Sequence, residues 1–115
     1  MDQCWTQGPH RADTPPGAIQ PPADSDLRIA TWIAAAAAGD ASAAFDLGVA
    51  CSTTGLDGNV DLVEAHKWFN LAAVAGHAEA KTCRAEIADE MTARDIAEAQ
   101  RRAREWLRAI AKRAA

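Results

Sequence analysis

The chain has 115 residues, a length that allows one domain at most. The segment from Arg94 to Ala115 holds seven basic and three acidic residues and so carries +4, which leaves −8 for the rest of a chain whose formal net charge is −4. Alanine is abundant and tyrosine is absent, which indicates an all-helical chain, and no stretch is long and apolar enough to predict a membrane span.

The first ten residues, MDQCWTQGPH, lack the basic and hydrophobic parts of a secretory signal. The three cysteines, Cys4, Cys51 and Cys83, share no C-x-x-C or metal-ligand spacing, so a disulfide framework is not expected. Both observations favour a cytoplasmic location, where thiols stay reduced.

Residues 1–24 differ in composition from the rest of the chain. They contain all five prolines, and proline removes an amide donor and holds the residue before it extended. We therefore expect a disordered, proline-rich arm over residues 1–24 and a folded domain over residues 25–115. Trp5 is the only aromatic residue of the arm, and it either docks on the domain or stays exposed.

Five antiparallel helices are predicted over the domain. The acidic and serine residues at positions 24–26 offer caps for a first helix, which Gly39 ends. Asp40 can then cap a second helix over about residues 41–52, and the glycine-bearing stretch 53–60 must be a loop.

The third helix is the one around which the others are expected to pack. Asp61 and Glu64 form a capping-box-like pair at its start, and Gly76 supplies a left-handed stop at its end. Its apolar residues form two adjacent rows, and a helix with two apolar rows needs a neighbour on each side. The rows are Ala65, Trp68, Ala72 and Ala75, and Leu62, Phe69 and Ala73.

A fourth helix is expected over about residues 78–91 and a fifth over about residues 92–113. Thr92 and Asp95 form a capping-box arrangement that opens the fifth helix. This helix is apolar on one side and largely charged on the other, as are the atypical elements that cover the ends of repeat stacks, so we predict that it acts as a lid. Its apolar stripe consists of Ile96, Ala99, Ala103, Trp106, Leu107 and Ile110.

The chain also contains an internal repeat with an offset of 37 residues. Placing Gly39 on Gly76 aligns Trp32 with Phe69 and brings alanines of the first helix onto alanines of the third. An aromatic residue, paired alanines, a glycine stop and an immediate new helix, recurring at such a period, are typical of stacked helical hairpins. The sequence therefore predicts a short superhelix of helical hairpins instead of a closed bundle.

Three segments carry a more specific likeness: AFDLG at 44–48, AHKWFNLAA at 65–73 and GHAEA at 76–80. With them the chain resembles the Sel1-like repeat family, whose members are relatives of the tetratricopeptide repeat. One repeat, over about residues 41–76, is complete and partial repeats flank it, while residues 92–113 look like the terminal capping helix of bacterial members. The motif positions are Phe45, Leu47, Gly48, Ala65, Trp68, Phe69, Ala72, Ala73 and Gly76.

This resemblance implies a superhelical scaffold or adaptor that binds a protein or peptide. In such stacks the first helices of the hairpins line the concave face, and here these would be the helices that begin at Ala41 and Ala78. The positions expected to contact a partner are Ser42, Asp46, Val49, Lys81, Thr82 and Arg84.

Two other functions remain open. A chain with barely two repeats has ends that need covering, so a self-associating structural unit, such as a homodimer, is one alternative. A nucleic-acid-contacting accessory protein is the other, because the fifth helix is basic. The residues concerned are Arg101, Arg102, Arg104, Arg108, Lys112 and Arg113.

No catalytic motif is recognisable in the sequence. There is no nucleophile elbow, and Gly55 and Gly58 lack the lysine and hydroxyl residue that a phosphate-binding loop needs. His66, His77 and Cys83 come nearest to a metal cluster, but they do not have the spacing of zinc ligands. We therefore expect no enzymatic activity, no cofactor and no bound metal.

Overall fold

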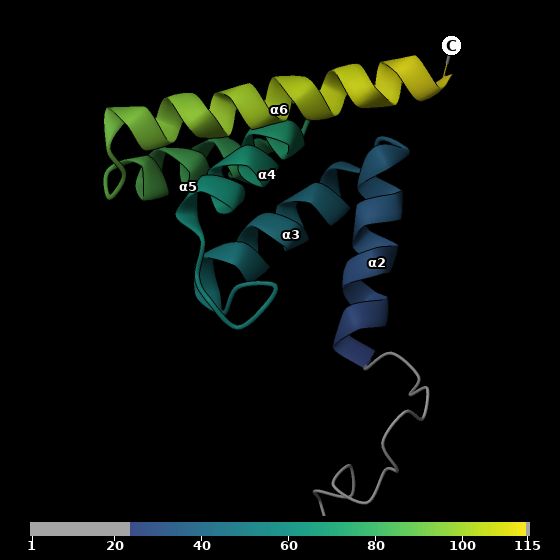
Figure 1. Ribbon diagram of the computed structural model, residues 1–115, viewed down its shortest axis with the longest axis horizontal. Coiled ribbons are helices and arrows are strands. Elements are labelled where there is room, and N and C mark those ends of the chain that lie inside the picture. Colours follow the sequence, from purple (N-terminus) through teal and green to yellow (C-terminus); the bar gives the residue numbers. More distant parts are fainter. Residues whose placement is uncertain (1–23, 115) are drawn as a thin grey trace, which may run out of the picture.

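The computed structural model describes residues 24–114, which form helices α2 to α6 and contain no strand. Successive helices from α3 to α6 alternate in direction, and α6 lies along one side of the others (Figure 1). The all-helical prediction is therefore confirmed for the described residues. The helices are α2 (Asp24–Ala37), α3 (Ala41–Thr53), α4 (Leu62–Val74), α5 (Ala78–Ala88) and α6 (Ala93–Ala114).

The expectation of a disordered arm over residues 1–24 falls outside the described residues, except at Asp24, where α2 begins. The expectations for Trp5 and Cys4 fall outside them too. None of the helices between residues 24 and 114 combines the length and the apolar character that crossing a bilayer requires.

The turns that end α2 and α4 have the same local structure. Gly39 has a φ of 100° and Gly76 a φ of 105°, a left-handed conformation that residues with a Cβ atom rarely adopt. In each turn the glycine N–H donates to the carbonyl three residues back and the next N–H to the carbonyl five residues back, at 2.9 to 3.1 Å. This is the Schellman pattern. The repeat seen in the sequence thus coincides with a repeat of local structure at its glycines.

Side chains cap the first turns of α3 and α6, as predicted. The Oδ1 atom of Asp40 accepts hydrogen bonds from the N–H groups of Ser42 and Ala43, at 2.9 and 3.2 Å. At the start of α6, the Asp95 N–H donates to Thr92 Oγ1 at 3.0 Å, and the Thr92 N–H donates to Asp95 Oδ2 at 3.4 Å. Both termini therefore have side-chain acceptors for backbone groups that the helix itself leaves unpaired.

At the start of α4 only half of the predicted capping box forms. The Glu64 N–H donates to Asp61 Oδ1 at 3.1 Å. The Glu64 carboxylate does not return this bond, because the Asp61 N–H donates to the carbonyl of Cys51, at 3.0 Å. Glu64 is therefore available for contacts outside its own helix.

Helix α4 is the centre of the domain, as its two apolar rows predict. It packs against α3, α5 and α6, and α2 packs on α3. Ala65 and Ala72 of α4 are fully buried, and so are the large side chains of Trp68 and Phe69 apart from small edges. The other large apolar anchors, which are partly buried around this core, are Trp32, Phe45 and Trp106.

Gly48 of α3 lies directly against the ring of Phe69 on α4. A Cβ atom added to Gly48 would lie 2.6 Å from two carbons of that ring, well inside the optimal separation of about 3.5 to 4.0 Å between carbon atoms. A glycine inside α3 therefore makes room for an aromatic side chain of the neighbouring helix, and not for that helix's backbone.

Helix α5 is shorter than predicted, because it ends at Ala88 and not near Met91. Beyond Ala88, the N–H groups of Glu90 and Met91 donate to carbonyls only three residues back, those of Ile87 and Ala88. Such bonds tighten the chain and end an α-helix. Only Ala80 of α5 is fully buried, so this helix gives the domain little core.

Helix α6 packs chiefly on α4 and not on α5, the helix before it. Ala99 and Ala103 are buried in this contact, and the ring of Trp106 meets that of Trp68 edge to face, with centroids 4.9 Å apart. Leu107, predicted to belong to the buried stripe, is 44% exposed. Leu107 lies about 100° around the helix from Trp106, at the edge of the apolar stripe and not at its centre. Beyond it, α6 runs past the end of α4, toward the C-terminal end of α2 (Figure 1).

Candidate functional site

The start of α5 meets α3 through two stacked rings. The imidazole of His77 lies nearly parallel to the ring of Phe45, with an interplanar angle of 8° and centroids 4.2 Å apart. His77 is the N-cap residue of α5, but its side chain makes no capping hydrogen bond. Both rings are partly exposed, so they belong to a surface that α3 and α5 share, which we call the α3/α5 surface.

The six positions predicted to contact a partner lie on these two helices. Val49 and Lys81 come one helical turn after Phe45 and His77, and because α3 and α5 run in the same direction, they continue the same surface (Figure 1). Val49 is 38% exposed. No hydrogen bond or ion pair within the described part of the chain joins the six positions to one another. Of the others, Ser42 and Thr82 are exposed, and Asp46 and Arg84 are half-buried.

Behind this surface, polar side chains lie between α4 and α5. Arg84 donates from Nη1 to Oδ1 of Asn70 at 2.6 Å, so its guanidinium is held in place. One turn earlier on α4, His66 is buried, and its Nδ1 atom has no hydrogen-bond partner. Burial lowers the pKa of His66, and the positive charge of Arg84 lowers it further. The imidazole is therefore neutral at physiological pH.

The metal-binding arrangement considered from the sequence, with His66, His77 and Cys83, has no counterpart here. Between residues 24 and 114, no three His, Cys, Asp or Glu side chains are grouped so that they could hold a metal ion. Cys51 is fully buried, and burial, together with nearby carboxylates such as that of Glu64, raises its pKa to about 12. A thiol with so high a pKa stays protonated and is a poor nucleophile.

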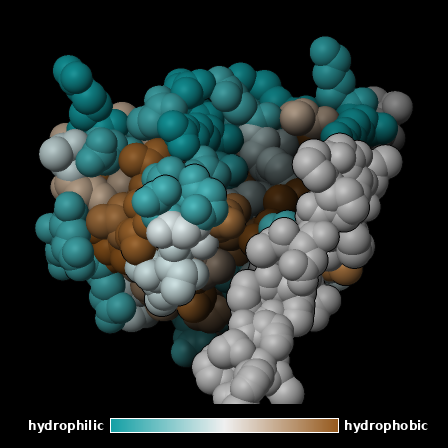
Figure 2. Space-filling view, turned by 60° about the horizontal axis from the view of Figure 1, so that its bottom comes forward, coloured by the Kyte–Doolittle hydropathy of each residue, from teal (hydrophilic) through white to brown (hydrophobic). Residues whose placement is uncertain are grey.

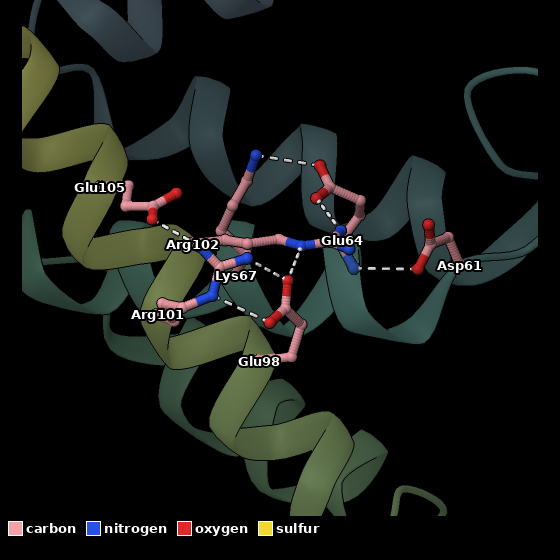
Figure 3. Close-up of polar contacts among 7 residues, drawn as sticks. All are labelled: Asp61, Glu64, Lys67, Glu98, Arg101, Arg102 and Glu105. Carbon is pink, nitrogen blue, oxygen red and sulfur yellow. Dashed lines mark hydrogen bonds and ion pairs between the residues drawn. The ribbon is translucent and has the colours of Figure 1, made fainter.

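A second polar cluster, which we call the α4/α6 clamp, fastens α6 to α4 (Figure 3). Arg102 of α6 lies with Nη1 2.7 Å from Oε2 of Glu64 on α4, and its Nε donates to Oε2 of Glu98 at 2.8 Å. The other oxygen of Glu64 lies 2.9 Å from Nζ of Lys67, which in turn sits 4.2 Å from the centre of the Trp68 ring. Each charge in the clamp therefore has an opposite charge or an aromatic face beside it.

The carboxylates of the clamp remain ionised to low pH. Burial raises the pKa of Glu64, but the hydrogen bonds from Lys67 and Arg102 outweigh it, and the pKa lies below its ordinary value. Hydrogen bonds from Arg101 and Arg102 lower the pKa of Glu98 to about 2. Partly exposed ion pairs contribute about 0 to 1 kcal/mol each, so the clamp orients α6 more than it stabilises the domain.

Two of the basic residues on which a nucleic-acid-binding function would depend are already paired with carboxylates in and beside the clamp. Arg101 pairs with Glu98 and Glu105, and Arg102 pairs with Glu98 and Glu64. The remaining basic residues of that set are exposed and, within the described residues, make no ion pair. They are Arg104, Arg108, Lys112 and Arg113.

No protein-family model matches the chain, and neither does any curated protein or solved structure.

Proposed function

We propose that this chain is a short helical-repeat scaffold of the Sel1-like type that binds a peptide or protein on the α3/α5 surface. The scaffold is supported by the two turns at Gly39 and Gly76, which share one backbone conformation at an offset of 37 residues. A stack of hairpins requires this kind of recurrence, in which a helix ends at a glycine turn and the next helix begins at once. The α3–α4 hairpin, over residues 41–74, is the complete unit of this stack.

The observation that carries the binding function is the partly exposed stacking of Phe45 on α3 against His77 at the start of α5. Rigid aromatic rings beside an exposed aliphatic side chain, here Val49, provide contact area at a low entropic cost. Asp46 and Lys81 add opposite charges that can orient a polar peptide. Figure 2 brings the lower side of Figure 1 forward and shows hydrophobic surface exposed among hydrophilic side chains on the side away from α6.

A peptide library displayed on phage tests this function with the full chain as bait. Synthetic copies of the enriched peptides would be titrated against the chain by fluorescence anisotropy. We expect Val49→Asp and Lys81→Glu each to weaken binding by about tenfold or more, which corresponds to about 1.4 kcal/mol. Lys81 is exposed, so Lys81→Glu should not change the melting temperature, and Val49→Asp, at a side chain that is 38% exposed, should lower it only slightly.

The matched control is Val60→Asp in the loop before α4, where the valine is 52% exposed and lies outside the α3/α5 surface. This variant should bind the selected peptides as well as the parent does. A library that yields no enriched peptide, or peptides whose affinity is the same for the Val49 and Lys81 variants as for the parent, would contradict the proposed function.

A further inference from the structure

The ends of α2 and α4 and the C-terminal half of α6 enclose an apolar groove, which we call the α2/α4/α6 groove. Its hollow has a volume of about 120 Å³, close to the roughly 150 Å³ of an apolar cavity that admits benzene. Small side chains of α2 and α4 form one part of its wall, and large side chains of α6 form another. Representative residues are Ala36, Ala37, Val74, Ala75, Leu107 and Ile110.

Two exposed apolar side chains border this hollow from different helices. Val74 on α4 is 66% exposed, and Leu107 on α6 is 44% exposed. A single exposed aliphatic residue is normal on a protein surface, but apolar side chains that converge on one hollow form a contiguous site. The groove does not contain Val49, Lys81 or the rings of the α3/α5 surface, so it is a separate place on the molecule.

Helix α6 carries positive charge close to Leu107, just outside the residues that line the hollow. Arg104 and Arg108 flank Leu107 on the helix, both are exposed, and neither has an ion-pair partner within the described residues. From Arg108 to Arg113, α6 carries three basic residues and no acidic one. Asp40 is the acidic residue that lines the hollow, and its carboxylate is occupied by the two N–H groups that it caps.

We propose that the α2/α4/α6 groove binds the apolar face of an acidic amphipathic helix from another protein. Helices bind grooves of this kind through apolar side chains spaced three or four residues apart. One such side chain fits the hollow, and the next ones along the helix lie against Val74 and Leu107. Acidic residues on the flanks of the bound helix pair with Arg104 and Arg108 and increase the rate of association.

A second copy of this chain fits the groove less well. In a two-fold symmetric pair this groove would meet the same groove of the second copy, so two basic borders would face each other, and like charges across an interface are unfavourable. Nucleic acid fits less well too, because its phosphates would pair with Arg104 and Arg108 but would make no favourable contact with the apolar side chains of Val74 and Leu107. The combination of apolar hollow and basic border therefore favours an acidic helix.

Synthetic peptides of about 18 residues, long enough for about five helical turns, test the proposal against the full chain. One peptide has leucines along one face and glutamates elsewhere, a second replaces glutamate by lysine, and a third has the composition of the first with its leucines spread around the helix. By fluorescence anisotropy we expect the first to bind at least about tenfold more tightly than either of the others. Its affinity should fall as salt is added.

Variants then assign the binding to the groove. Val74→Asp and Leu107→Asp should each weaken binding of the first peptide by about tenfold or more, and the milder Leu107→Ala, which keeps the fold, should weaken it by a smaller factor. Arg104→Glu should weaken binding at low salt, whereas Arg94→Glu, the same charge change on the exposed first turn of α6, should have no effect. Val49→Asp on the α3/α5 surface should have none either.

Four results would overturn the proposal. The first is equal binding of the peptide with spread leucines, and the second is binding that survives all three substitutions at Val74 and Leu107. The third is a dimer in sedimentation experiments that dissociates on Leu107→Asp, which would assign the groove to a second copy. The fourth is binding of a duplex oligonucleotide that depends on Arg104 but not on Leu107. The α3/α5 surface is tested by separate variants, Val49→Asp and Lys81→Glu. If the groove proves not to bind a helix, the test of binding at the α3/α5 surface is therefore unaffected.

Discussion

Trp106 offers the most direct test of how α6 docks on the domain. Its ring meets the ring of Trp68 edge to face, and Nζ of Lys67 lies 5.7 Å from its centre. Trp106 is only partly buried, so Trp106→Ala removes contact between α6 and α4 without opening a cavity at the centre of the core. The substitution should loosen α6 and leave the α3–α4 hairpin packed.

We expect Trp106→Ala to lower the free energy of unfolding by about 2 to 4 kcal/mol. Replacing a buried tryptophan by alanine costs about 3 to 5 kcal/mol, and a partly buried ring should lose about half of that. The edge-to-face pair with Trp68 adds about 0.5 to 1.5 kcal/mol. Domains of this size are stable by about 5 to 15 kcal/mol, so the variant should still fold.

Urea denaturation followed by circular dichroism gives the measurement, and Leu107→Ala is the matched control. Leu107 is the next residue of the same helix but is 44% exposed, so its replacement by alanine should cost about 1 kcal/mol or less. If the two variants lose equal stability, or if Trp106→Ala unfolds like the parent, α6 does not dock through this ring. A transition that shifts with protein concentration would point instead to self-association.

Four further predictions concern the core and the clamp. Gly48→Ala should lower the melting temperature through a loss of about 1 to 3 kcal/mol, because the new Cβ overlaps an aromatic ring; an unchanged melt would contradict the close contact. The lowered pKa of His66 means that the free energy of unfolding should decrease as the pH falls below about 6.5, because the unfolded chain then binds a proton more readily than the folded chain does. Denaturation of the His66→Gln variant at a series of pH values should not show this decrease. The lowered pKa of Glu64 means that its ionised carboxylate contributes fully to the free energy of unfolding above about pH 4.5 and that this contribution is lost below it. Arg102→Met should make the loss of stability in acid smaller. An identical dependence of stability on pH in the parent and the variant would argue against the clamp. Cys51 should react with iodoacetamide only in denaturant, and rapid alkylation of the folded chain, mapped by mass spectrometry, would show that it is not buried.

The parts of the fold that the sequence predicts are those decided by near neighbours. Asp40 caps α3 through N–H groups two and three residues away, and Thr92 and Asp95 exchange bonds within one turn. Gly39 and Gly76 end their helices because their own backbone conformation is left-handed. In each case the residue and its partner lie within a few positions of each other, so a local pattern is sufficient.

The parts that the sequence does not predict depend on partners far away along the chain. Glu64 has the right spacing to complete a capping box, but the Asp61 N–H that it would accept donates to the carbonyl of Cys51, and its carboxylate pairs with Arg102, 38 residues away. Leu107 lies at the edge of the apolar stripe of α6, and its exposure of 44% depends on which neighbours reach it. The groove beside it forms where α6 continues past the end of α4 at Val74, a difference in length that no pattern within one helix contains.

The α3/α5 surface arises where the repeat departs from its own pattern. Gly39 and Gly76 occupy equivalent places, but the residue that follows is Asp40 in one turn and His77 in the other. A carboxylate there can accept backbone N–H bonds, and Asp40 does so, whereas the side chain of His77 makes no such bond and its ring stacks on Phe45. An alignment of the chain with itself finds residues that are alike and therefore reveals the scaffold. The α3/α5 surface depends on His77, which differs from its counterpart Asp40, so the same alignment does not reveal it.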